Sequence, residues 1–159
     1  MQLKITTDYA IRTILYLAMH DGKIVPSSEV AGIMGIPRKY LIQIGTTLKK
    51  SGLIHTHTGI RGGYSLTRKP DQIRLFDIVH AMEDTNKINR CLEDDEYCSR
   101  FATKECPLRR CYCGMQQLWE GFLKSFSIAE LLDNTAEEKM GAWLDYTNRI
   151  LPQNLPKPD

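Results

Sequence analysis

The chain has 159 residues, enough for one compact domain with an extension but too few for two large domains. Its 42% hydrophobic and 25% charged residues contain no apolar run of the roughly 18 to 20 residues that a membrane span needs, and the N-terminus is charged and polar, so we expect a cytoplasmic protein without a membrane partner. The net charge is only +2, but residues 38–74 hold eight basic residues and one acid, which suits phosphate-backbone binding or, equally, a solvated surface.

Three helices are predicted in the first third of the chain. Apolar residues recur at helical spacing over 7–20, a capped second helix covers 30–34, and a third follows the turn Gly35-Ile36-Pro37. The inward stripe of the third helix is Leu41, Ile44 and Leu48. A short helix, a tight turn and a longer helix with polar and basic outward residues are typical of helix-turn-helix DNA binding.

A β-hairpin is predicted directly after the third helix. Residues 54–58 are β-prone, 59–63 form a glycine-rich turn, and 64–67 alternate as a returning strand. Such a hairpin forms the wing of a winged helix. Its glycines would let the tip approach a DNA backbone, and Arg61 would enter a minor groove, where the negative potential attracts guanidinium. The alternative is a turn that only closes the hairpin.

The second half of the chain predicts a brief strand leading into a helix at 73–82, then a loop without periodicity to about residue 104. A long helix follows, with a stripe of large apolar side chains formed by Leu108, Cys111, Met115, Leu118, Trp119, Phe122 and Phe126. One small domain cannot cover this stripe, so we expect a homodimer in which the partner's copy covers it. Beyond 133 the chain is polar, with a small docking helix around Trp143 before a flexible tail.

All five cysteines lie within 23 residues, at positions 91, 98, 106, 111 and 113. In a reducing compartment such clustering indicates a metal, a redox sensor or catalysis rather than a structural disulfide. Two close CxxC pairs, typical of zinc ribbons, are absent, and the wide spacing favours an iron–sulfur core with one further ligand, although zinc stays open. We expect Cys111, on the apolar stripe, to be a small buried hydrophobe, and Cys113 to be a spare ligand or redox partner.

Several stretches of the chain resemble a known family. The residues Tyr40-Leu41, Leu48 and Gly52-Leu53-Ile54, the wing at 59–66 and the run 73–79 are similar to the Rrf2 family of bacterial transcriptional regulators, and the resemblance extends over about 1–133. Members with iron–sulfur clusters share a winged helix, a long dimerisation helix and three cysteines in the loop between them. The resemblance therefore implies one [2Fe–2S] or [4Fe–4S] cluster per subunit, bound by Cys91, Cys98 and Cys106.

The resemblance also bears on the fourth ligand of that cluster. The family's iron–sulfur assembly regulators use a histidine where this chain has Arg109, which cannot ligate. Thr7-Asp8-Tyr9 is similar to the start of the nitric-oxide-sensing repressors, which with the rhizobial iron regulators have the nearest ligand pattern. Asp8 is thus implied as a ligand to a cluster bound mainly by the other subunit, the alternative being an acid that favours the helix dipole. Thr58 replaces an arginine common in the family's wing, so minor-groove reading falls on Arg61.

We therefore expect a mainly α fold with a small β-hairpin wing. The parts are a winged helix-turn-helix domain at 1–83, a cysteine-rich cluster-binding loop at 84–106, a dimerisation helix with a short following helix at 107–133, and a partly flexible C-terminal extension at 134–159. No paired carboxylates, nucleophile arrangement or phosphate-cradling loop indicates an enzyme.

The expected function is transcription regulation by a homodimer bound to an imperfect palindrome in double-stranded DNA. The expected DNA contacts are Ser28, Arg38, Lys39, Tyr40, Gln43, Lys50, Arg61 and Gly62. Loss, oxidation or nitrosylation of the cluster would change DNA affinity, which indicates a repressor that senses nitric oxide, redox state or iron status. The alternatives are a thiol-switch or zinc-containing regulator and, in another class, an iron–sulfur electron carrier or protein-docking module that binds no duplex.

Overall fold

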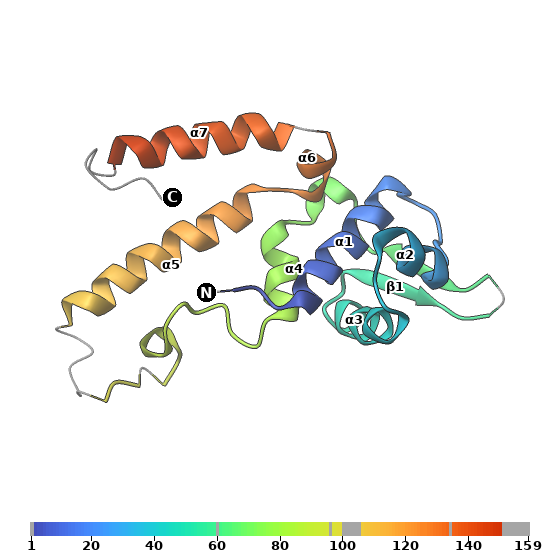
Figure 1. Cartoon of the computed structure of the whole chain (residues 1–159), viewed down its shortest axis with the longest axis horizontal. Coiled ribbons are helices and arrows are strands. Elements are labelled where there is room, and N and C mark those ends of the chain that lie inside the picture. Colours follow the sequence, from blue (N-terminus) through green and yellow to red (C-terminus); the bar gives the residue numbers. More distant parts are fainter. Residues whose placement is uncertain (1, 60, 96, 100–105, 134, 151–159) are drawn as a thin grey trace.

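The computed structural model describes residues 2–59, 61–95, 97–99, 106–133 and 135–150. It confirms the predicted class, since the described residues are mostly helical with one two-stranded antiparallel hairpin (Figure 1). In chain order the elements are α1 (Ile5–Met19), α2 (Ser27–Met34), α3 (Arg38–Lys50), β1 (Ile54–His57), β2 (Gly63–Leu66), the 3₁₀ turn η1 (Pro70–Gln72), α4 (Leu75–Met82), the 3₁₀ turn η2 (Arg90–Leu92), α5 (Pro107–Ser125), α6 (Ile128–Leu132) and α7 (Thr135–Ile150).

The helix-turn-helix forms as predicted. A three-residue connection at 35–37 joins α2 to α3, and the predicted stripe of α3, Leu41, Ile44 and Leu48, lies in the core against α1. Helix α2 begins at Ser27 rather than at residue 30. Its first turn is polar, so the apolar periodicity does not reveal it, whereas Pro26 in extended conformation places the N-terminus there.

The wing is anchored at its base to the α1–α2 connection. Strands β1 and β2 pair with Ile54 opposite Leu66 and His57 opposite Gly63. Tyr64 adds a bridge to Val25, whose N–H donates to the Tyr64 carbonyl at 2.8 Å, while the Tyr64 N–H donates to the Val25 carbonyl at 2.9 Å. A Cβ at position 63 would lie 2.0 Å from the Val25 carbonyl oxygen, so this approach requires glycine.

The chain returns to the winged-helix unit after α5. The Leu75 N–H donates to the Phe126 carbonyl, and the Ile128 N–H to the Ile73 carbonyl, both at 2.9 Å. The predicted brief strand at the start of 73–82 is thus a backbone bridge between Arg74 and Ser127. Ile128 is fully buried in the core, so α6 completes the packing of the winged-helix unit while α5 extends away from it (Figure 1).

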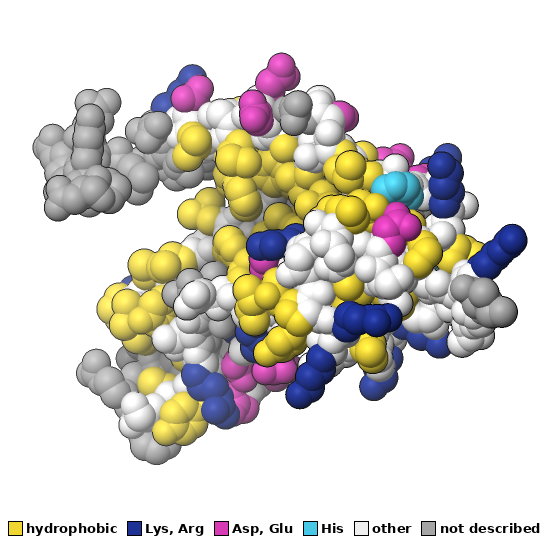
Figure 2. Space-filling view, turned by 45° about the vertical axis from the view of Figure 1, so that its right-hand side comes forward, with side chains coloured by type: hydrophobic (Ala, Val, Ile, Leu, Met, Phe, Trp, Pro, Cys, Tyr) yellow, Lys and Arg dark blue, Asp and Glu magenta, His cyan; other side chains and the backbone are white. Residues whose placement is uncertain are grey.

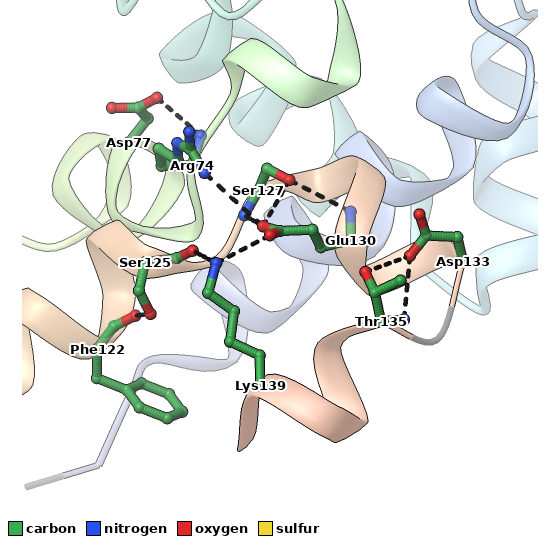
Figure 3. Close-up of polar contacts among 9 residues, drawn as sticks. All are labelled: Arg74, Asp77, Phe122, Ser125, Ser127, Glu130, Asp133, Thr135 and Lys139. Atoms are coloured by element: carbon green, nitrogen blue, oxygen red, sulfur yellow. Dashed lines mark hydrogen bonds and ion pairs between the residues drawn. The ribbon is translucent and has the colours of Figure 1, made fainter. Parts of the chain in front are cut away.

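A polar junction fixes the start of α7 (Figure 3). The Glu130 carboxylate accepts from the Ser127 N–H at 2.7 Å and from the Lys139 ammonium at 2.8 Å, and Lys139 also donates to the Ser125 carbonyl. The Lys139 hydrogen bond, followed by those of Ser127, lowers the Glu130 pKa to about 2. The Phe122 and Trp143 rings pack edge to face, 5.7 Å apart. The expected docking helix is therefore present, and longer than predicted.

One face of α5 has no cover within the described chain. Leu108, Met115 and Leu118 are exposed, and Figure 2 shows apolar side chains gathered over this part of the molecule, while Lys and Arg side chains lie across the winged-helix unit. Cys111 is exposed on the same face, so its predicted burial is wrong for the single chain. Burial would require a second molecule on α5, and the homodimer stays a prediction.

Candidate DNA interface and cysteine pocket

The predicted DNA-binding residues lie on α2, α3 and the wing. The five predicted on α3 are all exposed: Arg38, Lys39, Tyr40, Gln43 and Lys50. Ser28 is exposed on α2 and Arg61 is exposed in the wing turn, whereas Gly62 is half-buried. The structure thus presents polar and basic side chains on the outward surface of α3 and places the arginine of the wing in solvent.

A groove of about 350 Å³ separates α3 from the wing. Its helix side is lined by Ile42, Gly45 and Thr46, and Gly59 and Gly62 line its wing side. The serine that lines it is Ser27 rather than the predicted Ser28. The sequence prediction missed Ile42, because an apolar residue outside the buried stripe of α3 carries no recognised signal for DNA contact.

The spacing between α3 and the wing depends on a glycine. A Cβ at position 45 would lie 2.6 Å from the Tyr64 hydroxyl oxygen and 2.8 Å from its Cζ. Tyr64 is only 8% exposed, and burial raises the pKa of its phenol. Gly45 therefore lets a neutral tyrosine ring pack directly on the recognition helix.

The three predicted ligand cysteines line one pocket. Cys91 beside η2, Cys98 in the loop and Cys106 at the N-cap of α5 surround a cavity of about 390 Å³, together with Tyr97 and Arg109. No cysteine is in a disulfide. Residues 100–105, part of the predicted cluster-binding loop, lie outside the described residues. Closely spaced positions on the loop and at the start of α5 thus bring three thiols to a common cavity.

The donor set suits an iron–sulfur cluster better than a single ion. Among the described residues, no three His, Cys, Asp or Glu side chains converge closely enough to hold one metal ion. A zinc ion needs its four ligands within about 2.3 Å, whereas a cluster binds thiolates at several irons. Three thiols that line one cavity are compatible with the second requirement, and cluster binding by Cys91, Cys98 and Cys106 stays a prediction.

The other predicted metal-site residues lie elsewhere. Asp8, on α1, pairs with Arg12 at 2.6 Å and does not line the cysteine pocket of its own chain, so a role as ligand to a partner's cluster stays a prediction. Cys113 borders a separate cavity of about 280 Å³. Cys111 lines neither cavity.

Gln116 fastens the cysteine loop to α5. It is 6% exposed, its Oε1 accepts from the Ile88 N–H at 2.9 Å, and its Nε2 donates to the Asn86 carbonyl at 2.8 Å. Two turns closer to the pocket, the Arg109 Nε donates to the Cys91 carbonyl at 3.1 Å. This role of Gln116 could not be predicted from sequence, because burial by a loop leaves no periodic pattern.

A second set of contacts joins the start of the loop to α1 and α3. The buried Thr7 hydroxyl donates to the Glu83 carboxylate at 2.5 Å, and Lys4 pairs with Asp84 at 2.6 Å. Two residues further along α1, the Tyr9 ring packs edge to face against Tyr40 of α3, 5.9 Å between centroids. The loop, α1 and the exposed surface of α3 are therefore in physical contact.

Comparison with known proteins identifies this arrangement. The profile of the Rrf2 family, described as iron-dependent transcriptional regulator, matches residues 3–134. The chain belongs to the Rrf2 family. A protein of Aquifex aeolicus (strain VF5) that carries the name of an HTH-type transcriptional regulator is 32% identical over 134 residues, which are 84% of this chain and 92% of that protein.

Solved structures agree with the Rrf2 fold. IscR from T. potens has a TM-score of 0.66 at 24% identity, and covers 87% of this chain and 90% of its own. CymR, named the global cysteine regulator of B. subtilis, has a TM-score of 0.64 at 23% identity, and covers 84% of this chain and 98% of its own. At these identities the likeness establishes the winged-helix fold.

Three further points concern the C-terminal helix, membrane-spanning helices and enzymatic activity. Helix α7 lies entirely beyond the family match, which ends at residue 134. Among the described helices, none combines the length and apolarity needed to cross a bilayer. Regulators of this family act on transcription, so the expectation that the chain is not an enzyme agrees with its membership.

Proposed function

We propose that this Rrf2 regulator is a DNA-binding repressor whose affinity is set by an iron–sulfur cluster on Cys91, Cys98 and Cys106, and that it senses nitric oxide, redox state or iron status. The observation that carries the proposal is the common cavity lined by these three thiols. The family's description as iron-dependent supports the same assignment. When bound, such a cluster would supply a centre that oxidation, nitrosylation or iron loss can alter.

The residues around the cavity are arranged to hold the cysteines in place. The Asn89 side chain accepts from the Cys91 N–H at 3.2 Å, which fixes the start of η2. Arg109 donates from α5 to the Cys91 carbonyl and brings a positive charge to the edge of the cysteine pocket. Pro107 at the first position of α5 follows Cys106 and sets its backbone direction.

The proposed repressor is a homodimer bound to an imperfect palindrome. The exposed stripe of α5, including Leu108, Met115 and Leu118, repeats at the spacing of a helix–helix contact and would be buried by the partner's α5. Two-fold symmetry then presents two α3 helices to successive major grooves. In this arrangement Asp8 would reach the cluster of the partner subunit as its fourth ligand.

The proposed signal path follows the contacts of the cysteine loop. A change at the cluster would move η2, which is hydrogen-bonded to α5 through Arg109. The segment just before η2, residues 86–88, is bound to α5 by Gln116 and would move with it. The start of the loop reaches α1 through Glu83 and Thr7. Because α1 contacts α3, the position of the recognition helix becomes sensitive to the state of the loop.

The test is iron binding by serine variants purified without oxygen. Wild type should be brown, with iron and sulfide in equal amounts, and C91S, C98S and C106S should each lose visible absorbance. C111S is the matched control, since Cys111 lies on α5 outside the cavity, and it should keep the colour. Colourless wild-type protein with stoichiometric zinc would refute the cluster. Brown protein that selects no duplex from random DNA would indicate an electron carrier or docking module instead.

A second candidate function is a metal-free thiol switch. It is favoured by the similarity to CymR, which is named a cysteine regulator and whose Staphylococcus aureus protein was also solved in an oxidised form, and by the exposure of Cys111. A switch of this kind predicts that apo-protein binds DNA and that peroxide reversibly changes its affinity. C111S would abolish that response, whereas the cluster proposal predicts no effect of this substitution on the response of holo-protein to nitric oxide.

A further inference from the structure

Ile42 is an apolar residue on the surface of α3 that the fold does not use. At 65% exposed, it shares with Ile33 the highest exposure of any large hydrophobic residue in the described part of the chain. It lies between two polar, exposed residues of the recognition helix that were predicted to contact DNA or lie near it, Tyr40 and Gln43. A single exposed isoleucine is ordinary on a protein surface, but this one lies on a surface otherwise made of polar and basic groups.

Thr46 extends the apolar surface by one helical turn. It is four residues from Ile42, so the two side chains are neighbours on the same face of α3. The Thr46 hydroxyl donates to the Ile42 carbonyl at 3.0 Å, and its donor hydrogen is therefore used within the helix. The methyl group is the remaining part of this exposed side chain, so Ile42 and Thr46 together form a short apolar strip.

The strip faces the groove beside the wing. Ile42, Gly45 and Thr46 all line the cavity of about 350 Å³ between α3 and the hairpin, and the glycine between them adds no side chain. Ile42 has no hydrogen-bond donor, and the Thr46 hydroxyl already donates its hydrogen within the helix, so neither offers a donor to base edges or phosphates. The strip therefore lacks the donors that arginine, glutamine and asparagine use to read base edges.

One group on a base edge matches this chemistry. In the major groove, thymine alone presents a methyl group, whereas the other base edges present donors and acceptors. Given that α3 enters the major groove, as the proposed function requires, we infer that Ile42 and Thr46 read thymine by contact with its 5-methyl group. They then determine part of the sequence specificity, while the basic residues of α3 position the helix on phosphates.

The experiment measures the contribution of individual methyl groups. Wild-type protein first selects a binding site from random duplexes, and each thymine of that site is then replaced by deoxyuracil, which removes the methyl and keeps the base pair. We expect one or two positions in each half-site at which uracil weakens binding about three- to tenfold. In the Ile42→Ala protein, thymine and uracil should bind equally at one of these positions.

Ile33→Ala is the matched control. Ile33 has the same side chain and the same 65% exposure but lies on α2, so its truncation should leave the thymine–uracil ratio unchanged. A selected site without a uracil-sensitive thymine, or a sensitivity that I42A retains, overturns the inference and leaves the proposed function standing. If wild type selects no site at all, the proposed function fails and the inference fails with it.

Discussion

A methyl group added to the recognition helix should separate the effects of helix propensity and packing. Gly45 and Gly32 both lie inside helices with ordinary backbone angles, but their surroundings differ. A Cβ at position 32 meets nothing within 4 Å, whereas at position 45 it would lie 2.6 to 3.0 Å from three atoms of the Tyr64 ring. The same substitution, Gly→Ala, therefore adds a clash at one site only.

The expected magnitudes follow from these contacts. Replacing a helical glycine by alanine stabilises by roughly 0.5 to 1 kcal/mol, which is the expected gain for Gly32→Ala. At position 45 overpacking costs about 1 to 3 kcal/mol, because the buried Tyr64 ring has little room to move. Gly45→Ala should thus lower the free energy of unfolding by up to about 2.5 kcal/mol, and the melting temperature by up to roughly 10 °C.

Urea unfolding followed by circular dichroism, at one protein concentration for all variants, measures this difference. If G45A is as stable as G32A with an unchanged denaturant slope, the reasoning from Tyr64 is refuted. A double-mutant cycle identifies the clashing group, since Tyr64→Leu should remove most of the extra cost of G45A. The variants also test the interface, because displacement of the wing should weaken DNA binding by G45A and leave G32A unaffected.

Three further predictions concern the junctions between elements. The pKa of Glu130, about 2 in the folded protein against an ordinary 4.5, adds stability that is complete above about pH 4.5 and is lost as the pH falls toward 2. In the E130Q variant, the midpoint of urea unfolding should therefore depend less on pH across this range. Gln116→Leu strands backbone groups of residues 86–88 and should cost about 1 to 3 kcal/mol, with faster amide exchange there. Thr7→Val, which removes the donor to Glu83 and keeps the shape of the buried side chain, should destabilise by about 1 to 2 kcal/mol in thermal unfolding.

The parts of the fold predicted correctly from sequence depend on local signals. The turn at 35–37 and the alternation of the wing are properties of a few neighbouring residues, and both are confirmed. The return of the chain after α5 was missed because it depends on the pairing of Arg74 with Ser127, more than 50 positions apart. No local pattern announces such a bridge.

In the candidate sites, too, the features with a local sequence signal were predicted and those that depend on distant contacts were missed. Clustered cysteines predicted a shared site, and three of them line one cavity, because short intervals on a loop limit how far apart the thiols can lie. The contacts that hold this loop were invisible in the sequence, since Gln116 reads as an ordinary polar residue of a helix. Ile42 was overlooked for a related reason, because hydrophobicity alone suggests a core position until exposure is known.

Tyr64 limits how a signal can reach the DNA. Its backbone pairs with Val25 and its ring packs on Gly45, so a single residue joins the α1–α2 connection, the hairpin and the recognition helix. With these three parts fastened at one point, the angle between helix and wing is not free to vary. Under the proposed function, a signal would therefore move α3 and the wing together as one unit, and would change the distance between the two recognition helices of the dimer.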